Sequence, residues 1–207
     1  MSDEPQRRAY VLNTRPVLNF LGVNRWDVLA AALGEAVDLS PSVLEEIREH
    51  VGWTRRDFDR RVRLSPETID PNEITFIENL SRYDSQLRPP RVRLLQTIDL
   101  AELAISDGYV RAGRLDPGES EVLALGRQRG WVVVIDEFIG HCQAEADRIA
   151  QESTLGILVG AVTQGHFGSV EVSQIWARMQ TWWDYAPSRS LGEYLAGRAI
   201  WPPCPAE

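Results

Sequence analysis

Apolar runs alternate with amphipathic segments along most of the chain, an order that is typical of a parallel sheet covered by helices. Trp131 to Ile135 is the clearest strand, because its large and β-branched residues show no polar alternation. Tyr10 to Leu12 is a shorter run of the same kind. The hydrophobic pattern therefore predicts an α/β fold with buried strands.

Helix caps and apolar periodicity predict most of the other elements. Helices are expected from about residue 17, from residue 138, and over about 25–33, 41–50, 71–87, 99–106, 117–129, 172–183 and 191–199, with short strands over 36–39 and 91–96. Residues 154–163 are apolar enough for either a buried strand or a helix. A tail with three prolines, over about 200–207, is expected to be extended.

The length of 207 residues and the hydrophobic content of 43% suit a single domain over residues 1–207. Residues 51–109 are more polar and rich in arginine. We expect them to form an insertion at one edge of the sheet.

No run approaches the roughly 18 apolar residues of a membrane span, and Met1 to Arg8 is charged with no apolar segment behind it. We therefore expect no membrane association, no signal peptide and a cytoplasmic location. Cys142 and Cys204 lie in a predicted helix and in the tail, which favours reduced thiols over a disulfide.

The net charge of −8 argues against a surface that is generally coated by nucleic acid. The chain has no lysine, so all 22 basic residues are arginine and lysine-based covalent catalysis is excluded. Local arginine clusters are compatible with RNA binding, and the candidate RNA-binding residues are Arg55, Arg56, Arg60 and Arg61. The alternative is a solvated surface on which these arginines pair with acids such as Asp57 and Asp59.

Several other chemistries lack their sequence signals. There is no Walker loop, no glycine-rich dinucleotide motif after the first strand and no nucleophile elbow. His50 and His166 show no metal-ligand spacing with each other or with either cysteine, so no zinc site is expected.

Polar residues follow directly after the two clearest strands. Asn13 comes after the first strand, and Asp136 and Glu137 come after Trp131 to Ile135. The carboxyl ends of parallel strands on either side of a topological switch point form a shared crevice, so these side chains can meet. This is where the sequence predicts a metal site.

Four segments, taken together, carry a family resemblance. They are Leu12-Asn13-Thr14 with Val17-Leu18 behind it, Val43-Leu44-Glu45-Glu46-Ile47, Leu115-Asp116-Pro117-Gly118-Glu119, and Ile135-Asp136-Glu137 followed by Thr154-Leu155-Gly156-Ile157-Leu158. In order and spacing the chain resembles PIN-domain proteins, close to the branch that includes the VapC-like toxin ribonucleases of bacterial toxin-antitoxin pairs. The resemblance covers nearly the whole chain except residues 51–109.

The resemblance implies a three-layer α/β/α fold with a short parallel sheet, and a metal-dependent endoribonuclease, the toxin of a toxin-antitoxin pair. It implies RNA as substrate, a protein antitoxin and a homodimer as partners, and carboxylates around Mg²⁺ or Mn²⁺, hard cations that prefer oxygen ligands. By matching position, the catalytic and metal-binding residues would be Asn13, Glu46, Glu119 and Asp136, with Glu137 as a helper and Thr14 orienting the first ligand.

Each of these residues also has a purely structural interpretation. Glu119 has the spacing of a capping-box partner of Asp116, and Asp136 could be a helix N-cap. Either Glu45 or Glu46 could face the site. His141 stands where relatives usually carry an arginine, and it could bond Asp136 or a phosphate, or be a partly buried group on a helix flank.

Asn13 is the main departure, because the family places an aspartate there and an amide brings no charge to a metal. The chain could be an inactivated variant, an enzyme that tolerates asparagine, or a PIN fold that no longer cleaves. The alternative function is therefore a non-catalytic PIN-fold protein that binds RNA or a protein partner, and a plain α/β interaction module is a third. Aromatic and apolar residues near the C-terminus could serve a partner or pack on their own domain; these are Leu191, Tyr194, Leu195 and Trp201.

Overall fold

The computed structural model describes residues 9–34, 37–88, 92–96, 98–113, 115–182, 191–196 and 201–205. Within these residues the sheet has five strands, all parallel, in the order β3-β2-β1-β4-β5. The strands are β1 (Tyr10–Leu12), β2 (Val37–Leu39), β3 (Val92–Leu94), β4 (Val132–Val134) and β5 (Gln151–Glu152). The predicted parallel sheet is confirmed.

Strand β1 lies at the centre of the sheet. Val11 is opposite Asp38 of β2 on one side and Val133 of β4 on the other. From β1 the chain adds β2 and then β3 on one side of the sheet, and then β4 and β5 on the other side. The direction in which strands are added therefore reverses between β1 and β4. A topological switch point of this kind opens a crevice at the carboxyl ends of the two strands.

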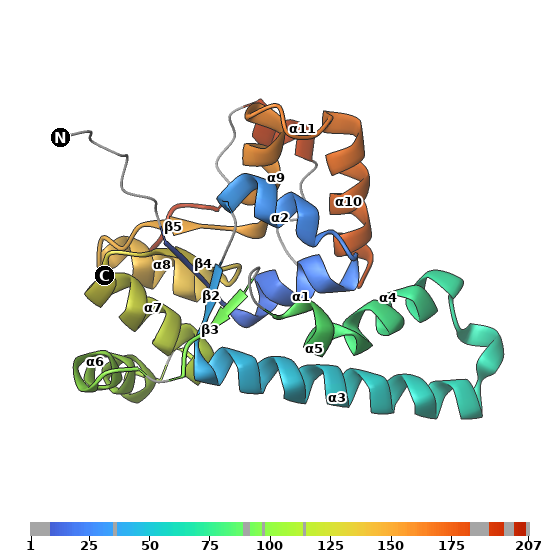
Figure 1. Cartoon of the computed structure of the whole chain (residues 1–207), viewed down its shortest axis with the longest axis horizontal. Helices are drawn as coiled ribbons and strands as arrows, with labels where there is room; N and C mark the ends of the chain where they lie inside the picture. The colour runs from blue at the N-terminus through green and yellow to red at the C-terminus, as the bar shows by residue number, and fades with distance from the viewer. Residues whose placement is uncertain are drawn as a thin grey trace.

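Helices cover the sheet from both sides, which confirms the predicted three-layer α/β/α fold. In Figure 1, α3, α6 and α7 lie on one side of the sheet, and α2, α9, α10 and α11 lie on the other. The helices are α1 (Thr14–Gly22), α2 (Trp26–Leu33), α3 (Pro41–Leu64), α4 (Pro71–Ser81), α5 (Tyr83–Gln86), α6 (Leu100–Arg111), α7 (Pro117–Arg129), α8 (Phe138–Ala146), α9 (Thr154–Thr163), α10 (Ser169–Trp182) and α11 (Leu191–Leu195), with the 3-10 helix η1 (Pro66–Thr68).

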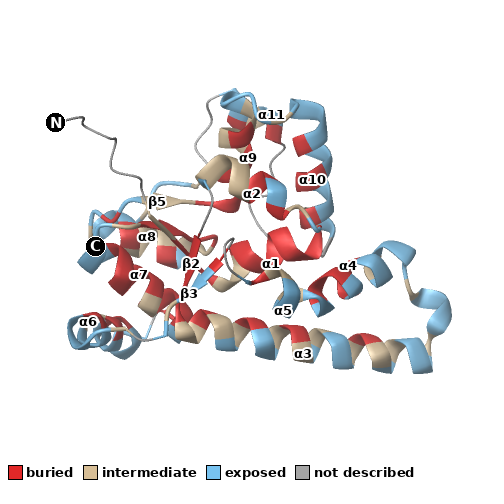
Figure 2. Ribbon diagram, in the orientation of Figure 1, coloured by how far each residue is buried: buried red, intermediate tan, exposed pale blue. Residues whose placement is uncertain are grey.

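The core follows the apolar pattern of the sequence. All three residues of β4 are buried, as are Val11 and Leu12 of β1. Figure 2 shows this burial concentrated at the sheet and on the helix faces turned toward it. The ends of β1 and β4 are therefore held by dense packing on both sides.

Helix α3 is much longer than expected, since it continues past His50 to Leu64. Two features support the extension: Val51 and Phe58 are buried and lie seven residues apart on one face, and Pro66 follows where the helix ends. The charged composition of residues 51–64 concealed this spacing. The expected start of the insertion at residue 51 therefore lies inside a continuous helix.

Helix α4 returns along α3 and docks on α1 (Figure 1). Asn79 donates a hydrogen bond from Nδ2 to the backbone oxygen of Gly22 at 3.0 Å. A Cβ at Gly22 would overlap the ring of Phe76, so the glycine permits the close approach. The contact fixes the outer part of α3 to the core of the fold.

Several predicted boundaries are shifted. The helix predicted over 71–87 is divided into α4 and α5. The side chain of Asp70 caps the start of α4, whereas the side chain of Glu73 pairs with Arg61 and takes no part in the cap. Helix α6 runs to residue 111, residues 154–163 form a helix, and β3 occupies the middle of the strand predicted over 91–96. Some positions of the predicted helices, strands and tail lie outside the described residues: 36, 91, 183, 197–200, 206 and 207.

Three of the four C-terminal candidates for partner contacts pack on their own domain. Leu191 and Tyr194 are buried, and Trp201 lies beside the ring of Phe138, whereas Leu195 is exposed. Residues 202–205 have no regular secondary structure, as predicted for the tail.

The prediction of two reduced thiols is wrong. Cys142 of α8 and Cys204 form a disulfide, with their Cα atoms 5.5 Å apart and a sequence separation of 62. The tail folds back onto α8, a long-range contact that has no local signal in the sequence.

None of the helices in the described part of the chain has the length and apolar character needed to span a bilayer.

Candidate metal centre

A cavity of about 460 Å³ opens at the carboxyl ends of β1 and β4. Its walls come from the start of α1, from α3, from the residue before α7 and from the residue before α8. They are formed by Asn13, Thr14, Arg15, Leu18, Glu46, Glu49, His50, Trp53, Asp116 and Glu137. The polar side chains thus meet where the strand order predicts a crevice.

Asn13 occupies the N-cap position of α1, yet its side chain makes no capping hydrogen bond. Its Nδ2 atom donates to Oε2 of Glu137 at 3.1 Å. Its Oδ1 atom is buried and has no hydrogen-bond partner among the described residues. An unpaired buried oxygen of this kind is costly unless a ligand binds it.

Glu46 of α3 is held in the cavity from two sides. Its carboxylate accepts a hydrogen bond from Oγ1 of Thr14 at 2.5 Å and another from the backbone N–H of Gly118 at 2.8 Å. A Cβ at position 118 would overlap this carboxylate, so only glycine allows the approach. Glu45 points to solvent and pairs with Arg48, which settles which of the two glutamates faces the site.

The capping-box interpretation of Glu119 of α7 is confirmed. It forms a capping box with Asp116: the Asp116 carboxylate accepts from the Glu119 backbone N–H at 2.7 Å, and Oε2 of Glu119 accepts from the Asp116 N–H at 3.3 Å. Its other oxygen, Oε1, is buried and has no hydrogen-bond partner in the described part of the structure. A Cβ at Gly140 of α8 would lie 3.2 Å from this atom. Oε1 therefore faces the start of α8.

The carboxylates that line the cavity and the neighbouring carboxylate of Glu119 are close enough to disfavour one another's charge. Burial, followed by the charges of Asp116, Glu137 and Glu46, raises the pKa of Glu119 from its ordinary value of 4.5 to about 8. Burial also raises the pKa of Glu46, an effect that the hydrogen bond from Thr14 opposes. A bound cation would relieve this repulsion.

Asp136 does not line the cavity. Its carboxylate accepts hydrogen bonds from the backbone N–H of Thr154 at 2.7 Å, from Oγ1 of Thr154 at 2.5 Å and from Nδ2 of Asn19 at 2.9 Å. These bonds tie the end of β4 to α1 and α9 and leave Asp136 2% exposed. The structure thus turns this predicted site residue toward the protein interior.

Glu137 occupies the place that the sequence analysis gave to Asp136. Its carboxylate accepts from Asn13 and pairs with Arg15 at 3.0 Å, and it lines the cavity. Asp116 also lines the cavity, although the sequence indicated only a helix cap. The sequence did hold a signal that only one of Asp136 and Glu137 enters the cavity. In extended backbone, consecutive side chains point in opposite directions.

The cavity also has an aromatic rim that the sequence analysis did not identify. His50 and Trp53 of α3 line it, with their ring centroids 6.5 Å apart. The side chain of Trp53 is 61% exposed. Because α3 was expected to end at His50, the position of Trp53 near Glu46 could not be anticipated.

The four candidate RNA-binding arginines lie further along α3. Arg55 pairs with Asp59, and Arg61 pairs with Asp57 and Glu73, as the alternative interpretation of a solvated surface expects. Arg56 and Arg60 line a separate surface hollow with Asp59, Arg63 and Leu64. The structure therefore places these arginines outside the acidic cavity.

His141 does not reach the cavity either. Its Nδ1 atom lies 2.9 Å from Oε1 of Gln151, and its side chain is 21% exposed. The interpretation of His141 as a partly buried polar group on a helix flank is the one that the structure supports.

The donor set of the cavity fits a hard divalent cation. Carboxylate and amide oxygens are the protein ligands that Mg²⁺ and Mn²⁺ prefer. Asn13, Glu46, Asp116 and Glu137 line the cavity, and Oδ1 of Asn13 is buried without a partner in the described residues. Glu119 does not line the cavity, but its unpartnered Oε1 belongs to a carboxylate that is close enough to feel the charges of Asp116, Glu137 and Glu46. The residues that could hold the cation are Asn13, Glu46, Glu119, Glu137 and Asp116.

A comparison with protein families matches residues 82–195, more than half of the chain, to the family model DUF3368, which is described as a PIN domain. The matched residues include β4 and α7 with Asp116, Glu119 and Glu137, whereas Asn13 and Glu46 lie before them. No curated protein and no solved structure gave a significant match.

Proposed function

Because the chain belongs to the PIN-domain family, a nuclease fold, we propose that it is a metal-dependent endoribonuclease whose centre is the acidic cavity at the ends of β1 and β4. The observation that carries the proposal is the pair of buried, unpartnered oxygens on Asn13 and Glu119 beside several carboxylates. Oxygen atoms left unpaired in this setting are suited to a cation.

In this proposal Asn13, Glu46, Glu119 and Glu137 hold Mg²⁺ or Mn²⁺, with Asp116 at the edge of the site. The cation supplies Lewis-acid polarisation of a phosphodiester and neutralises its charge. Asp136 acts through position: its bonds to Thr154 and Asn19 fix the backbone that presents Glu137. Asp136 is therefore a positioning residue and Glu137 the ligand.

The chain's own residues also suit an extended nucleic-acid strand. Arg15, which lines the cavity beside Glu137, presents a guanidinium that can contact a phosphate. The ring of Trp53 is exposed at the rim and can stack on an unpaired base. Arg56 and Arg60, further along α3, would contact the backbone of a longer strand.

The direct test is metal titration together with cleavage of a labelled single-stranded RNA in Mn²⁺ and in Mg²⁺. We expect binding of the cation and metal-dependent cleavage by the wild-type chain, and loss of both in Glu137→Gln. Glu78→Gln, an exposed position on α4, is the matched control and should change neither. Equal metal binding by Glu137→Gln and wild type would contradict the proposed centre.

The resemblance to VapC-like proteins supports a role as the toxin of a toxin-antitoxin pair, with a protein antitoxin and a second copy of the chain as partners. Expression of the chain in a bacterial host should then arrest growth, and Glu137→Gln should relieve the arrest. Growth that is equally slow with both chains would argue against a toxic nuclease.

Asn13 supports a second function, a PIN fold that binds RNA without cleaving it. The amide already satisfies Glu137 with a hydrogen bond, which lowers the need for a cation at that carboxylate. RNA binding without cleavage in wild type, with cleavage appearing in Asn13→Asp, would favour this function over the first.

A further inference from the structure

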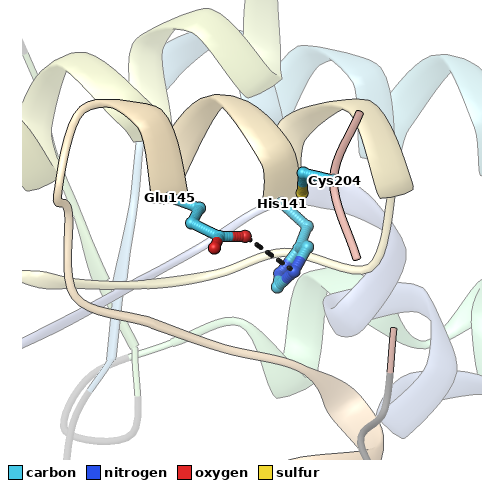
Figure 3. Close-up of side chains that lie close together, drawn as sticks. All are labelled: His141, Glu145 and Cys204. Atoms are coloured by element: carbon cyan, nitrogen blue, oxygen red, sulfur yellow. Dashed lines mark ion pairs between the residues drawn. The ribbon is translucent and has the colours of Figure 1, made fainter. Parts of the chain in front are cut away.

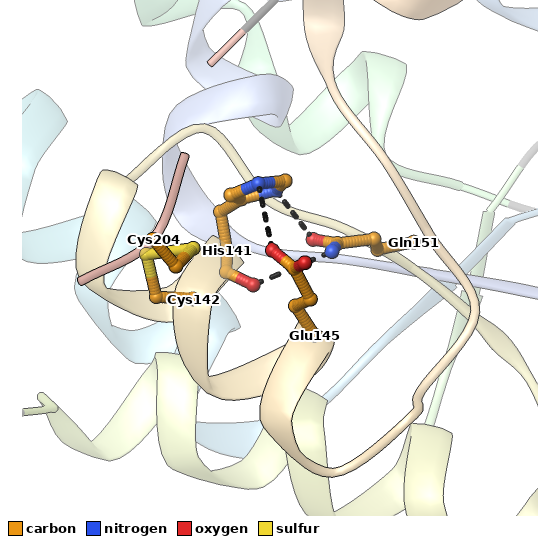
Figure 4. Close-up of a disulfide and its surroundings, with 5 residues drawn as sticks. All are labelled: His141, Cys142, Glu145, Gln151 and Cys204. Atoms are coloured by element: carbon orange, nitrogen blue, oxygen red, sulfur yellow. Dashed lines mark hydrogen bonds and ion pairs between the residues drawn. A yellow bond between two sulfur atoms is a disulfide. The ribbon is translucent and has the colours of Figure 1, made fainter. Parts of the chain in front are cut away.

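A second group of metal-ligand atoms lies on the outer side of α8, apart from the acidic cavity. A ring nitrogen of His141, a carboxylate oxygen of Glu145 and the sulfur of Cys204 all lie within 4.8 Å of one another (Figure 3). His141 and Glu145 are four residues apart, so they share one face of the helix. Cys204 is bonded to Cys142, whose sulfur is not one of these three atoms but lies directly beside that of Cys204 (Figure 4).

We propose that the protein, once this disulfide is reduced, binds Zn²⁺ through Cys142, Cys204, His141 and Glu145. Two thiolates, an imidazole and a carboxylate are all zinc ligands, and four of them complete a tetrahedral site. The site would hold the C-terminal tail on α8 in place of the covalent bond.

The ligand atoms of His141, Glu145 and Cys204 need only small side-chain movements to reach zinc geometry, and the side chain of Cys142 has to rotate toward them. Nε2 of His141 lies 3.9 Å from Oε2 of Glu145, and ligand atoms of a tetrahedral zinc site are separated by about 3.3 to 3.8 Å. After reduction, the two sulfurs must move apart to about 3.8 Å, which rotation of the cysteine side chains supplies. The Cα atoms, 5.5 Å apart, can stay in place.

The surroundings of His141 prepare it as a ligand. Nε2 of Gln151 donates to the backbone oxygen of His141 at 3.3 Å, which leaves Oε1 of Gln151 to accept from Nδ1 of the ring at 2.9 Å (Figure 4). The proton is therefore on Nδ1, and the lone pair of Nε2 faces Glu145. Orientation of a histidine through its second nitrogen is characteristic of metal ligands.

The ring of Trp201, in the same tail as Cys204, covers one side of His141 at 5.7 Å between centroids, and Phe138 lies at 6.5 Å. Both rings thus pack against the imidazole that would bind the ion. The side chain of Glu145 is 63% exposed, so the opposite side is open to an entering ion.

The two states are linked by balanced thiol chemistry. A dithiol reductant breaks the S–S bond, each protein sulfur gains one electron and one proton, and the reductant becomes a disulfide. Zn²⁺ then displaces both thiol protons as the thiolates bind it. A disulfide oxidant reverses the sequence and expels the ion, so the state of the site follows the redox state of its surroundings.

The test is zinc titration of the full chain before and after reduction, with a chromogenic chelator in competition. The reduced protein should bind one Zn²⁺ with a submicromolar Kd, and the oxidised protein should bind at least about 100-fold more weakly. Substitution with Co²⁺ should give a thiolate-to-metal charge-transfer band. A reduced chain that binds no Zn²⁺, or a cobalt complex without this band, would overturn the proposal.

Variants separate the site from adventitious binding. Gln151→Leu should weaken zinc binding by about 10-fold or more through loss of the orienting bond, and His141→Gln should weaken it further. His166→Gln, an exposed histidine outside the cluster, should bind as wild type does. Circular dichroism checks that each variant is folded. Unchanged binding by a folded Cys142→Ser/Cys204→Ser chain, with or without loss of stability, would also overturn the proposal.

Discussion

The side-chain amide of Asn13 donates a hydrogen bond to the carboxylate of Glu137 at 3.1 Å, across 124 residues of sequence. The bond joins the residue after β1 to a residue after β4 and leaves Oδ1 of Asn13 buried in the cavity. In place of the aspartate expected from the family resemblance, the chain therefore carries an uncharged amide that stabilises the Glu137 carboxylate by a hydrogen bond.

Asn13→Asp should have opposite effects in the absence and in the presence of metal. Without metal, a carboxylate would face Glu137 and the donated bond would be lost, so the free energy of unfolding should fall by about 1 to 3 kcal/mol. With Mn²⁺, the added charge should tighten binding by roughly ten-fold to a hundred-fold. Thermal denaturation in EDTA and in Mn²⁺, with calorimetric titration, measures both. Tighter binding that persists in Asn13→Asp/Glu137→Gln would show that the two residues do not share a centre.

Asp136 and Glu137 should respond differently to removal of charge. Asp136→Asn loses a carboxylate that accepts three hydrogen bonds, so the protein should be destabilised by about 2 to 4 kcal/mol. Glu137→Gln should change stability by less than about 1 kcal/mol and remove metal binding instead. Chemical denaturation and metal titration of both variants provide the comparison. The reverse assignment would follow if folded Asp136→Asn lost metal binding while Glu137→Gln kept it.

Gly118→Ala should displace Glu46 from the cavity, since the added Cβ overlaps the Glu46 carboxylate. We expect metal affinity to fall by about ten-fold, as when a group that orients a ligand is lost. Gly108→Ala in α6 is the matched control, because nothing lies within 4 Å of its added Cβ. The control should gain about 0.5 to 1 kcal/mol of stability and leave metal binding unchanged. Equal metal affinity in the two variants would mean that Glu46 is no ligand.

The metal-free protein should lose stability as the pH rises. The pKa of Glu119 is about 8 in the folded protein against an ordinary value of 4.5, so folding favours the protonated carboxyl. Its contribution to stability is fully present below about pH 4.5 and is lost as the pH rises through 8, a change on the order of 2 to 4 kcal/mol.

Glu119→Gln should flatten this pH dependence in EDTA, and saturating Mn²⁺ should reduce it in the wild-type chain. Glu67→Gln, at an exposed position, serves as control. Urea denaturation between pH 5 and pH 9 gives the slope for each chain. Identical slopes for wild type and Glu119→Gln would show that Glu119 is not the group responsible.

Trp53→Ala should weaken binding of single-stranded RNA without destabilising the fold. Its side chain is largely exposed at the rim of the cavity, and a stacked base contributes about 1 to 3 kcal/mol, so the Kd should rise about five-fold to a hundred-fold. Leu100→Ala removes an exposed apolar side chain from α6 and should leave binding unchanged. Fluorescence anisotropy with a labelled oligonucleotide measures both. A similar loss of affinity in the two variants would show that Trp53 makes no specific contact with RNA.

The sequence by itself determined the class of fold and the place of the site. Unbroken apolar runs predicted β1 and β4, and the capping box at Asp116 and Glu119 predicted the start of α7, because these signals depend on neighbouring residues. A polar residue after each strand then indicated the crevice at the switch point.

The tertiary structure decided which side chains enter that crevice. Asp136 turns inward because Thr154 and Asn19 offer it hydrogen-bond donors, and Glu137 reaches Asn13 and Arg15. Contacts of this kind join residues more than a hundred positions apart in several cases, so no local pattern encodes them. The same reason applies to the length of α3, which depends on packing against α4, and to the disulfide, which depends on the return of the tail to α8.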